Sequence, residues 1–576
     1  MILLQLKRVE RPRELKWYQA GAMLYGDWGT SKAYVLGIAF AYCGHASWFF
    51  LGLMSILTAL VGICYMVICR AYPDGGGVYS SVKHVSQTLA VVGALLLIAD
   101  YTVTASLSAL SAFQYLNVPH PEQWAVAAII TIGAINWLGP GKGGSIALII
   151  GIAASLTAGV LFLFTLPALA HVNLDWPTGS LTHNWSNFVA IVLALSGVEA
   201  VANMTGIMKL PVERTSKFAI WPVLLEVSIL TFLLGIAMNA IPNLGLHTED
   251  MLRALGNYYI GPWYGQIISV VFAFLLLSAV NTAISDLVSI QFSMARDREL
   301  PGMFSSLNRF GMPWLALIIA VSIPLLVLII EHDLIRLASL YAIGVVGAIT
   351  LNLGATATNF KIQLKKQERI LLFVSTVILA FIELTIAFQK HHALIFALTI
   401  LGTGLALRFI AKAAVPAPIP EGVLSVNVLT VSEAKEIAPL YQSSSLVALK
   451  SVNPFLLDEA AMRVKAKGEN SIYLVYVEES PPTRELPQEI EPSTKSLEIL
   501  GQAQSEMEAR GITAVPVWRI GDNPGKLIAD AARQLEVKTV MMGATKRSAL
   551  TNLLRGDVFR TLARNLPHEC HLVISG

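Results

Sequence analysis

The pattern of hydrophobic positions divides the chain into two regions. Residues 17–413 form one long apolar segment after another, whereas residues 414–576 alternate short apolar and polar stretches, as soluble proteins do. A bilayer core is about 30 Å thick, and a helix needs roughly 20 apolar residues to cross it. On that measure the sequence predicts about twelve transmembrane helices. They cover residues 18–42, 46–70, 88–116, 123–138, 144–169, 186–208, 217–242, 262–291, 313–330, 334–359, 368–388 and 391–412.

This pattern also predicts the domain organisation. We expect an α-helical transmembrane domain over residues 1–413, a Pro-rich linker with a short extended segment over 414–443, and a soluble domain over 444–576. The N-terminal segment has no apolar core with a cleavage site, so we expect no signal peptide. The four cysteines have no spacing typical of a metal site or a disulfide framework, and the net charge of +3 gives no indication of nucleic acid binding.

Charged side chains predict the orientation of the membrane domain. They make up 14% of the chain, below the roughly 25% of soluble proteins. Short loops rich in Lys and Arg stay in the cytoplasm. One set of alternate loops carries most of these cations, and the other set carries only Arg253, Arg336 and Lys390. We therefore expect a multi-pass protein of a bacterial inner (cytoplasmic) membrane with both termini in the cytoplasm.

Helix breakers occur at equivalent places in the first and sixth spans. The first contains Gly26-Asp27-Trp28-Gly29, and the sixth contains Ser196-Gly197-Val198-Glu199. Broken helices at matching positions of two halves indicate an inverted-repeat transporter with its binding site at the breaks. Glycines alone could instead serve close helix packing, but an acid stands at each break. We therefore expect a 5+5 inverted repeat of the LeuT-like kind, followed by two further helices.

Acidic residues within the spans are candidate site residues, because a carboxylate at the bilayer centre costs about 2.5–3.5 kcal/mol on insertion scales. Asp100, Thr104 and Ser108 follow one another at intervals of four, so they share one face of the third span. A carboxylate and two hydroxyls on one face offer hard oxygen ligands that suit an alkali cation. The alternative is that the hydroxyls bond back to their own helix.

The remaining charges within the spans are open to structural interpretations. For Glu226, Asp286 and Glu383 we expect structural pairing or an interfacial position. Lys32 lies shortly after Asp27 in the first span. It could pair with Asp27 and weaken cation binding, or extend toward the outside.

The string Tyr25-Gly26-Asp27-Trp28-Gly29-Thr30-Ser31, with Tyr34 three residues on, resembles the first-helix signature of the KUP potassium transporters. These belong to the amino acid–polyamine–organocation (APC) superfamily, with the shorter KimA-type potassium–proton symporters. The resemblance implies alternating access, no enzymatic activity, and potassium and protons as substrates. The potassium-binding residues that it implies are Asp27, Tyr34, Asp100, Thr104, Ser108, Ser196 and Tyr341. It implies that Glu199 carries the proton.

Two other functions stay open at this point. The stretch from Ser196 to Gly206 also looks like the sixth helix of cationic amino acid permeases, so a proton-coupled permease for amino acids or other organic cations is the alternative. In such a protein the first break must hold the substrate carboxylate with backbone N–H groups, and Asp27 would repel it. A membrane-embedded sensor is the third class, and it would not need acids at both breaks.

The soluble domain has the pattern of an α/β fold. Five apolar runs, SLVALKS, SIYLVYV, ITAVPVW, VKTVMMG and CHLVIS, predict strands, and helices are predicted between them at 454–467, 493–510, 524–535 and 556–565. Such alternation indicates a parallel sheet covered on both faces. The order resembles the universal stress protein fold.

The phosphate motif of that fold is only partly present. Its positions hold Gly543, Lys546, Gly556 and Asp557, where the family has glycine at the second position and a hydroxyl at the last. We therefore expect no resident cofactor and no ATP binding. Homodimerisation is one interpretation of this domain. Regulation by a nucleotide second messenger, such as a cyclic dinucleotide held by Gly543, Gly556, Lys546 and Arg547, is the other.

Overall fold

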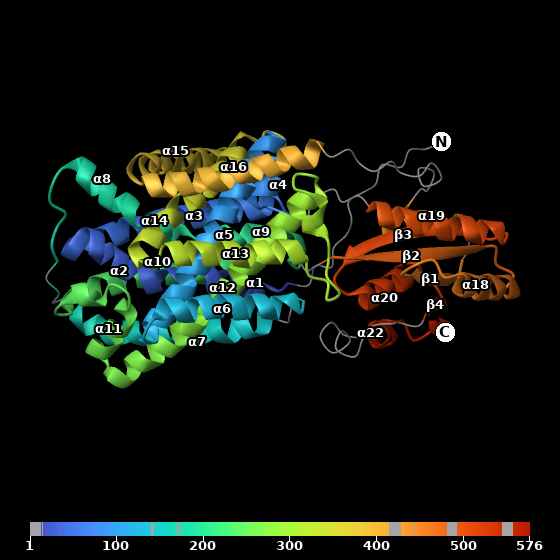
Figure 1. The fold of residues 1–576 in the computed structure, drawn as a ribbon, viewed down its shortest axis with the longest axis horizontal. Coiled ribbons are helices and arrows are strands. Elements are labelled where there is room, and N and C mark those ends of the chain that lie inside the picture. Colours follow the sequence, from blue (N-terminus) through green and yellow to red (C-terminus); the bar gives the residue numbers. More distant parts are fainter. Residues whose placement is uncertain are drawn as a thin grey trace.

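The computed structural model describes residues 13, 15–139, 143–169, 172, 174–413, 428–441, 443–480, 492–543 and 557–575. The chain folds into a helical bundle followed by an α/β domain that lies beyond one end of the bundle (Figure 1). The helices α8 (Leu181–Ala190) and α11 (Met251–Tyr259) lie at the opposite end of the bundle.

A helix, or a group of short helices, lies over each of the twelve predicted spans. The long ones are α1 (Trp17–Trp28) with α2 (Ser31–Cys43), α3 (Ser47–Ala71), α5 (Gln87–Tyr115), α6 (Pro121–Trp137), α7 (Gly143–Thr165), α10 (Val212–Ala237), α12 (Pro262–Arg296), α13 (Trp314–Ile330), α14 (Leu334–Thr358), α15 (Lys366–Gln389) and α16 (His391–Ala413). The sixth span consists of α8, a 3-10 turn at Val192–Leu195, α9 (Ala200–Asn203) and a second 3-10 turn at Thr205–Ile207. The short helix α4 (Val78–Val82) lies outside the spans.

Length and composition alone support membrane crossing for most of these helices. Among the described residues eight helical stretches qualify, or nine if the bent pair of the sixth span counts as one. The first stretch, Trp17–Ala71, has 55 residues, which at 1.5 Å per residue would extend about 80 Å, more than twice the bilayer core. The chain turns at Gly44, where φ is 56°, so this stretch holds two spans. The helices α6 and α13 have 17 residues each.

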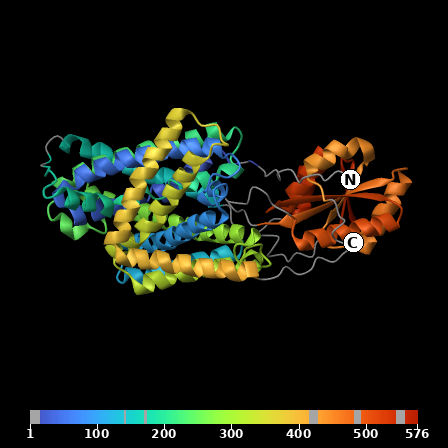
Figure 2. The same ribbon diagram turned by 90° about the horizontal axis from the view of Figure 1, so that it is seen from above.

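Burial distinguishes central from peripheral helices. In α5, 83% of an apolar 18-residue stretch long enough to cross the membrane is buried, because this helix packs against α12 and α14 in the middle of the bundle. The corresponding stretches of α15 and α16 are only 28% and 17% buried. These two helices lie on one face of the bundle (Figure 1) and diverge from one end (Figure 2). Their apolar exposed side chains therefore suit a lipid environment.

The C-terminal domain contains the five predicted strands, all parallel, in the order β3-β2-β1-β4-β5. The strands are β1 (Ser445–Leu449), β2 (Ser471–Glu479), β3 (Thr513–Gly521), β4 (Thr539–Gly543) and β5 (His571–Ser575). The helices between them are α18 (Pro454–Ala466), α19 (Thr494–Ala509), α20 (Pro524–Gln534) and α22 (Val558–Asn565), as the sequence predicts. Helices cover both faces of the sheet (Figure 2).

One predicted segment differs from the structure. Part of the predicted linker with its extended segment is the helix α17 (Val431–Tyr441), which contacts β3 and α20. Leu429, just before it, exchanges backbone hydrogen bonds with Pro516 and Trp518 of β3. This segment is therefore packed on the C-terminal domain rather than free of it. The Pro-rich stretch before it, and Pro439 within the helix, hide its helical pattern.

The basic loops converge at the end of the bundle nearest the C-terminal domain. Arg13 pairs with Asp74, Arg70 pairs with Glu368 of α15, and Lys83 pairs with Asp297. An ion pair and apolar contacts join this end to the C-terminal domain. Arg296, the last residue of α12, pairs with Glu478 of β2, and Phe292 of α12 belongs to an apolar cluster that includes Leu457 and Trp518.

Candidate functional site

The first span is interrupted at the predicted place. The helix α1 ends at Trp28, Gly29 and Thr30 form a turn, and α2 begins at Ser31. Two hydroxyls stabilise this turn. The Thr30 Oγ1 donates to the Asp27 carbonyl at 2.5 Å, and the Ser31 Oγ donates to the Trp28 carbonyl at 2.7 Å. Asp27 therefore stands at a helix end, buried inside the bundle.

The sixth span is interrupted more deeply. It bends by 45° between Leu181–Ala190 and the helical turns that follow. Ser196 has an extended backbone, with φ −62° and ψ 146°, and Gly197 has a φ of 94° that favours glycine. The Gly197 amide donates to the Glu199 Oε2 at 3.1 Å. The Glu199 Oε1 is buried and has no hydrogen-bond partner among the residues that the structure describes.

The two interruptions pack directly against each other. A Cβ atom at position 197 would lie 2.6 Å from the backbone nitrogen of Trp28 and 3.1 Å from the carbonyl carbon of Asp27. Only a glycine permits this approach. The contact brings the acids of the two breaks into one region, as the inverted-repeat interpretation requires.

The helix α5 supplies the predicted oxygen-bearing face. The Thr104 Oγ1 donates to the Asp100 carbonyl at 3.0 Å and lies 3.3 Å from the Asp100 Oδ1. The back-bonding alternative is therefore true of Thr104, although its hydroxyl also touches the carboxylate. The Asp100 Oδ2 and the Ser108 Oγ are buried and, within the described chain, form no hydrogen bond. Their lone pairs are available to a ligand.

The helix α14 completes the cluster. The Tyr341 hydroxyl donates to the Ser196 Oγ and so links α14 to the broken sixth span. At Gly344 the same helix presses on α5, since a Cβ there would lie 2.8 Å from the Asp100 nitrogen. The Tyr34 hydroxyl of α2 and the Tyr341 hydroxyl both lie near Asp27 and Asp100.

All eight predicted residues are buried. The charges of Asp27 and Glu199 act on the Asp100 carboxyl. None of the eight is more than 5% exposed. The exposed fractions are Asp27 5%, Tyr34 2%, Asp100 0%, Thr104 3%, Ser108 1%, Ser196 2%, Glu199 4% and Tyr341 1%.

One further acid belongs to this cluster. Asp286 of α12 is 4% exposed and lies near Asp100 and Glu199. The sequence indicated a structural or interfacial role for it, because it stands near one end of its span. The helix α12 has 35 residues and crosses the whole bundle. The sequence pattern does not reveal which face of α12 packs toward the other acids, so it could not place Asp286 among them.

Lys32 takes neither of the two roles considered from the sequence. Its ammonium group is fully buried and donates to the two Glu226 carboxylate oxygens at 2.7 and 2.8 Å, and to the Tyr25 hydroxyl at 3.0 Å. The Tyr25 hydroxyl donates to the Glu226 Oε1 at 2.9 Å. Lys32 and Glu226 therefore neutralise each other between α2 and α10, which confirms structural pairing for Glu226.

Glu383 does not show the expected pairing. Its Oε2 is buried and has no hydrogen-bond partner among the described residues. Its carboxyl group lies against α14, because a Cβ at Gly347 would stand 3.1 Å from the Glu383 Oε1. This glutamate touches the helix that carries Tyr341, without reaching the cluster.

The predicted nucleotide residues lie only partly within the described chain. Gly543 ends β4 beside Asn453, which follows β1, since a Cβ at Gly543 would lie 3.8 Å from the Asn453 Nδ2. Asp557 caps α22 by accepting a hydrogen bond from the Phe559 amide at 2.9 Å. Lys546, Arg547 and Gly556 lie outside the described residues, so the nucleotide site stays a prediction.

Comparisons with known proteins agree with this architecture. A family model described as amino acid permease matches residues 15–410, and one described as the universal stress protein family matches residues 447–573. The potassium transporter KimA of Bacillus subtilis (strain 168) is 27% identical over 379 residues. This match covers 59% of the present chain and 60% of KimA, so the chain spans less than two thirds of the curated relative's length.

Proposed function

The chain belongs to the amino acid permease family, with a universal stress protein domain at its C-terminus, and on this premise we propose that it imports potassium ions in symport with protons by alternating access. A multi-pass membrane transporter of the APC type follows from the family and from the apolar helices. The observation that supports a cation as substrate is the burial of three acids, Asp27, Asp100 and Glu199, close to one another inside the bundle.

The donor atoms of the cluster suit potassium. Carboxylate, hydroxyl and carbonyl oxygens are the ligands that an alkali cation accepts when it loses water. In our proposal the ion is held by Asp100, Thr104 and Ser196, with Ser108 further along the same face of α5. Asp27, Tyr34 and Tyr341 guide the ion to this place and close it there.

Glu199 is the proposed proton carrier. One of its carboxylate oxygens accepts the Gly197 amide, and the other has no partner within the described chain. Because the sixth span is broken at this residue, a movement of its halves changes what surrounds the carboxyl. A carboxyl whose surroundings alternate between water and a closed cluster takes up a proton on one side and releases it on the other.

An amino acid substrate is the alternative, and the name of the matching family favours it. Such a substrate carries a carboxylate, which must be held by backbone N–H groups at a break. The acid cluster opposes this, since Asp27 and Glu199 stand at the two breaks. The buried cation of α2, Lys32, does not help, because its ammonium already faces Glu226.

We also propose how the protein is oriented in the membrane and what its C-terminal domain does. Both termini lie on the cytoplasmic side of a bacterial inner membrane, because the basic loops gather at the end nearest the C-terminal domain. The C-terminal domain joins two copies of the chain or receives a cyclic dinucleotide at the ends of β1 and β4. Ligands of such sheets bind where the strand order reverses, and these two strands meet there.

Growth at limiting potassium tests the proposal. The full chain is expressed in cells that lack their own potassium uptake, beside Asp27→Asn, Glu199→Gln and the control Glu331→Gln at the opposite end of the bundle. We expect rescue by the wild type and the control, and none by the two site variants. Absence of rescue by well-inserted wild type, combined with uptake of a labelled amino acid, would establish the alternative.

A further inference from the structure

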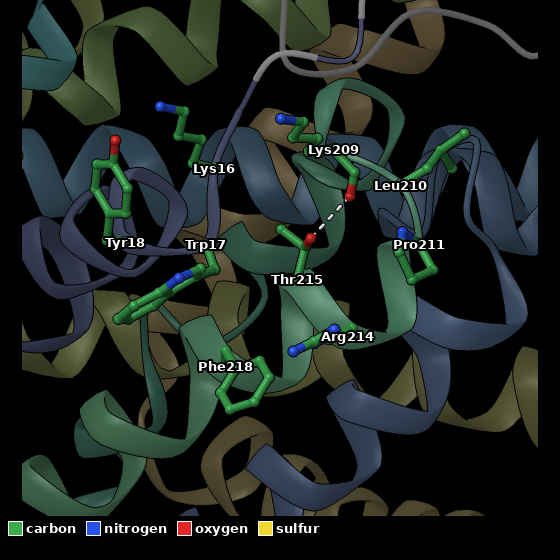
Figure 3. Close-up of a pocket in the computed structure, with 9 residues that line it drawn as sticks. All are labelled: Lys16, Trp17, Tyr18, Lys209, Leu210, Pro211, Arg214, Thr215 and Phe218. Atoms are coloured by element: carbon green, nitrogen blue, oxygen red, sulfur yellow. Dashed lines mark hydrogen bonds between the residues drawn. The ribbon is translucent and has the colours of Figure 1, made fainter.

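A pocket outside the transport cluster lies where the first and seventh spans begin. Its volume is about 460 Å³, and its walls come from the residues before and in the first turn of α1 and from the loop that leads into α10 (Figure 3). Three cationic side chains line it, namely Lys16, Lys209 and Arg214. Because these residues stand at the ends of spans, the pocket lies at the level of the membrane surface.

No described acid forms an ion pair with the cations of the pocket. Within the part of the chain that the structure describes, no ion pair joins Lys16, Lys209 or Arg214 to a carboxylate. Lys16 lies 5.7 Å from the centre of the Tyr18 ring, and Arg214 lies 5.7 Å from that of Phe218. The pocket therefore presents three positive charges that suit an anion.

Exposed apolar groups surround these charges. Trp17 is 48% exposed and Phe218 is 51% exposed, and their ring centres are 6.2 Å apart. After Arg214 in the sequence, exposed apolar side chains continue along the same face of α10 at intervals of three or four residues. They are Phe218, Trp221, Leu225 and Ile229. A face of this kind, running from a basic pocket into the span, suits the acyl chain of a lipid.

We propose that this pocket binds the phosphate of an anionic phospholipid, whose acyl chain lies along the exposed face of α10. Basic pockets between transmembrane helices bind anionic headgroups, and aromatic side chains gather at the same level. A soluble phosphate shares the charge but has nothing to place on the apolar face. The inference concerns binding and does not depend on which substrate is transported.

The position of the pocket gives the lipid a mechanical role. Leu15 exchanges backbone hydrogen bonds with Ile207 and Lys209, at 3.1 and 2.9 Å. The Thr215 Oγ1 donates to the Lys209 carbonyl at 2.8 Å, as the dashed line in Figure 3 marks. A lipid that contacts Lys16, Lys209 and Arg214 together therefore fastens the start of the first span to the sixth and seventh spans.

Lipid binding to the purified full chain tests the proposal. The chain in neutral detergent is titrated with phosphatidylglycerol and with phosphatidylcholine of the same acyl chains, and bound lipid is counted by native mass spectrometry. One cation near an anionic surface changes affinity by about fivefold. We expect the wild type to prefer phosphatidylglycerol by about tenfold or more, and Lys16→Ala/Lys209→Ala/Arg214→Ala to reduce this preference to about twofold or less.

Matched variants distinguish lipid binding in the pocket from a general effect of positive charge on the protein surface. Lys217→Ala/Lys361→Ala/Lys366→Ala removes the same charge from exposed positions outside the pocket, and it should keep the preference. The reversal Lys16→Arg/Lys209→Arg/Arg214→Lys should keep it as well. Arg214→Gln alone, at an exposed position, should lower the preference about fivefold if the triple variant fails to fold. Equal losses in the pocket and control triples, or no preference in the wild type, would overturn the proposal.

Soluble anions test the source of the phosphate. Inorganic phosphate and glycerol 3-phosphate are added as competitors at concentrations up to a hundred times that of the lipid. We expect neither to displace phosphatidylglycerol. Displacement by either one at a concentration similar to that of the lipid would show a site for free phosphate instead.

Discussion

Gly197 packs against Trp28 so closely that a Cβ atom at position 197 would stand 2.6 Å from the Trp28 backbone nitrogen. This contact joins the two broken spans at the place where their acids lie. It requires glycine for two reasons, since the approach leaves no room and the φ of 94° disfavours other residues. The transport cluster therefore depends on one backbone position without a side chain.

Gly197→Ala should abolish transport. The clash and the backbone conformation together cost about 1–3 kcal/mol or more, and relief of the clash separates the two breaks. Gly159→Ala in α7 is the control, because a Cβ there meets nothing within 4 Å. Potassium uptake and surface expression are measured for both. Normal uptake by Gly197→Ala would show that the close approach of the two breaks is not needed.

Substitution of Ser108 in α5 should weaken potassium binding, whereas substitution of Ser106 in the same helix should lower stability. The Ser108 Oγ has no hydrogen-bond partner within the described chain, whereas the Ser106 Oγ donates to the Pro324 carbonyl at 2.9 Å. Ser108→Ala should raise the KM for potassium about fivefold with unchanged Tm, since a lost ligand oxygen contributes about 1 kcal/mol. Ser106→Ala should lower the Tm and leave the KM unchanged. An unchanged KM in Ser108→Ala would remove this hydroxyl from the ion path.

Lys32 and Glu226 should be strongly coupled in stability. Removal of one partner leaves a buried charge without compensation, which costs about 3–5 kcal/mol. Lys32→Met and Glu226→Gln should therefore each lower the Tm markedly, and the double variant should lower it less than the sum of the two. Thermal unfolding of the three purified variants gives the coupling. Strict additivity would show that the two side chains do not form a pair in the membrane.

The contact between Arg296 and Glu478 should loosen in acid. Burial alone would raise the pKa of Glu478, but the charge of Arg296 and hydrogen bonds from Ser496 and the Ser493 amide hold that pKa below its usual value. A lowered pKa in the folded state contributes stability that is present above the ordinary pKa of a glutamate, about 4.3, and is lost as the pH falls through the folded pKa. The C-terminal domain should therefore stay attached at neutral pH and loosen below about pH 4.

Hydrogen exchange of the backbone amides at the end of β2 measures how firmly the C-terminal domain is attached. Glu478→Gln should increase exchange there at pH 7, as acid does for the wild type. Glu459→Gln, at a half-buried position of α18 paired with Arg463, is the control and should have no effect. Unchanged exchange in Glu478→Gln would show that other contacts hold the domain.

Much of the fold was accessible from the sequence, because long apolar runs and period-two strands leave strong patterns. The ranges of the twelve spans and of the five strands match helices and strands of the structure, and the break at Asp27 lies where glycines predict it. The inverted repeat itself stays a prediction. The helix α17 was missed, since prolines before and within it conceal its pattern.

The candidate site was only partly accessible. Spacing along one helix places Asp100, Thr104 and Ser108 together, because that relation is local. The partner of Lys32 lies 194 residues away, and the burial of Asp286 within the acid cluster depends on the rotation of α12. Such long-range relations arise from packing among helices, and apolar periodicity in the membrane does not fix them.

Proton movement driven by potassium tests the central claim most directly. The purified full chain is reconstituted into vesicles that contain a pH-sensitive dye, and potassium is added outside. The account predicts that potassium acidifies the lumen, that sodium at the same concentration does not, and that Glu199→Gln abolishes the effect. A lumen whose pH does not respond to potassium but falls on addition of an amino acid would contradict it.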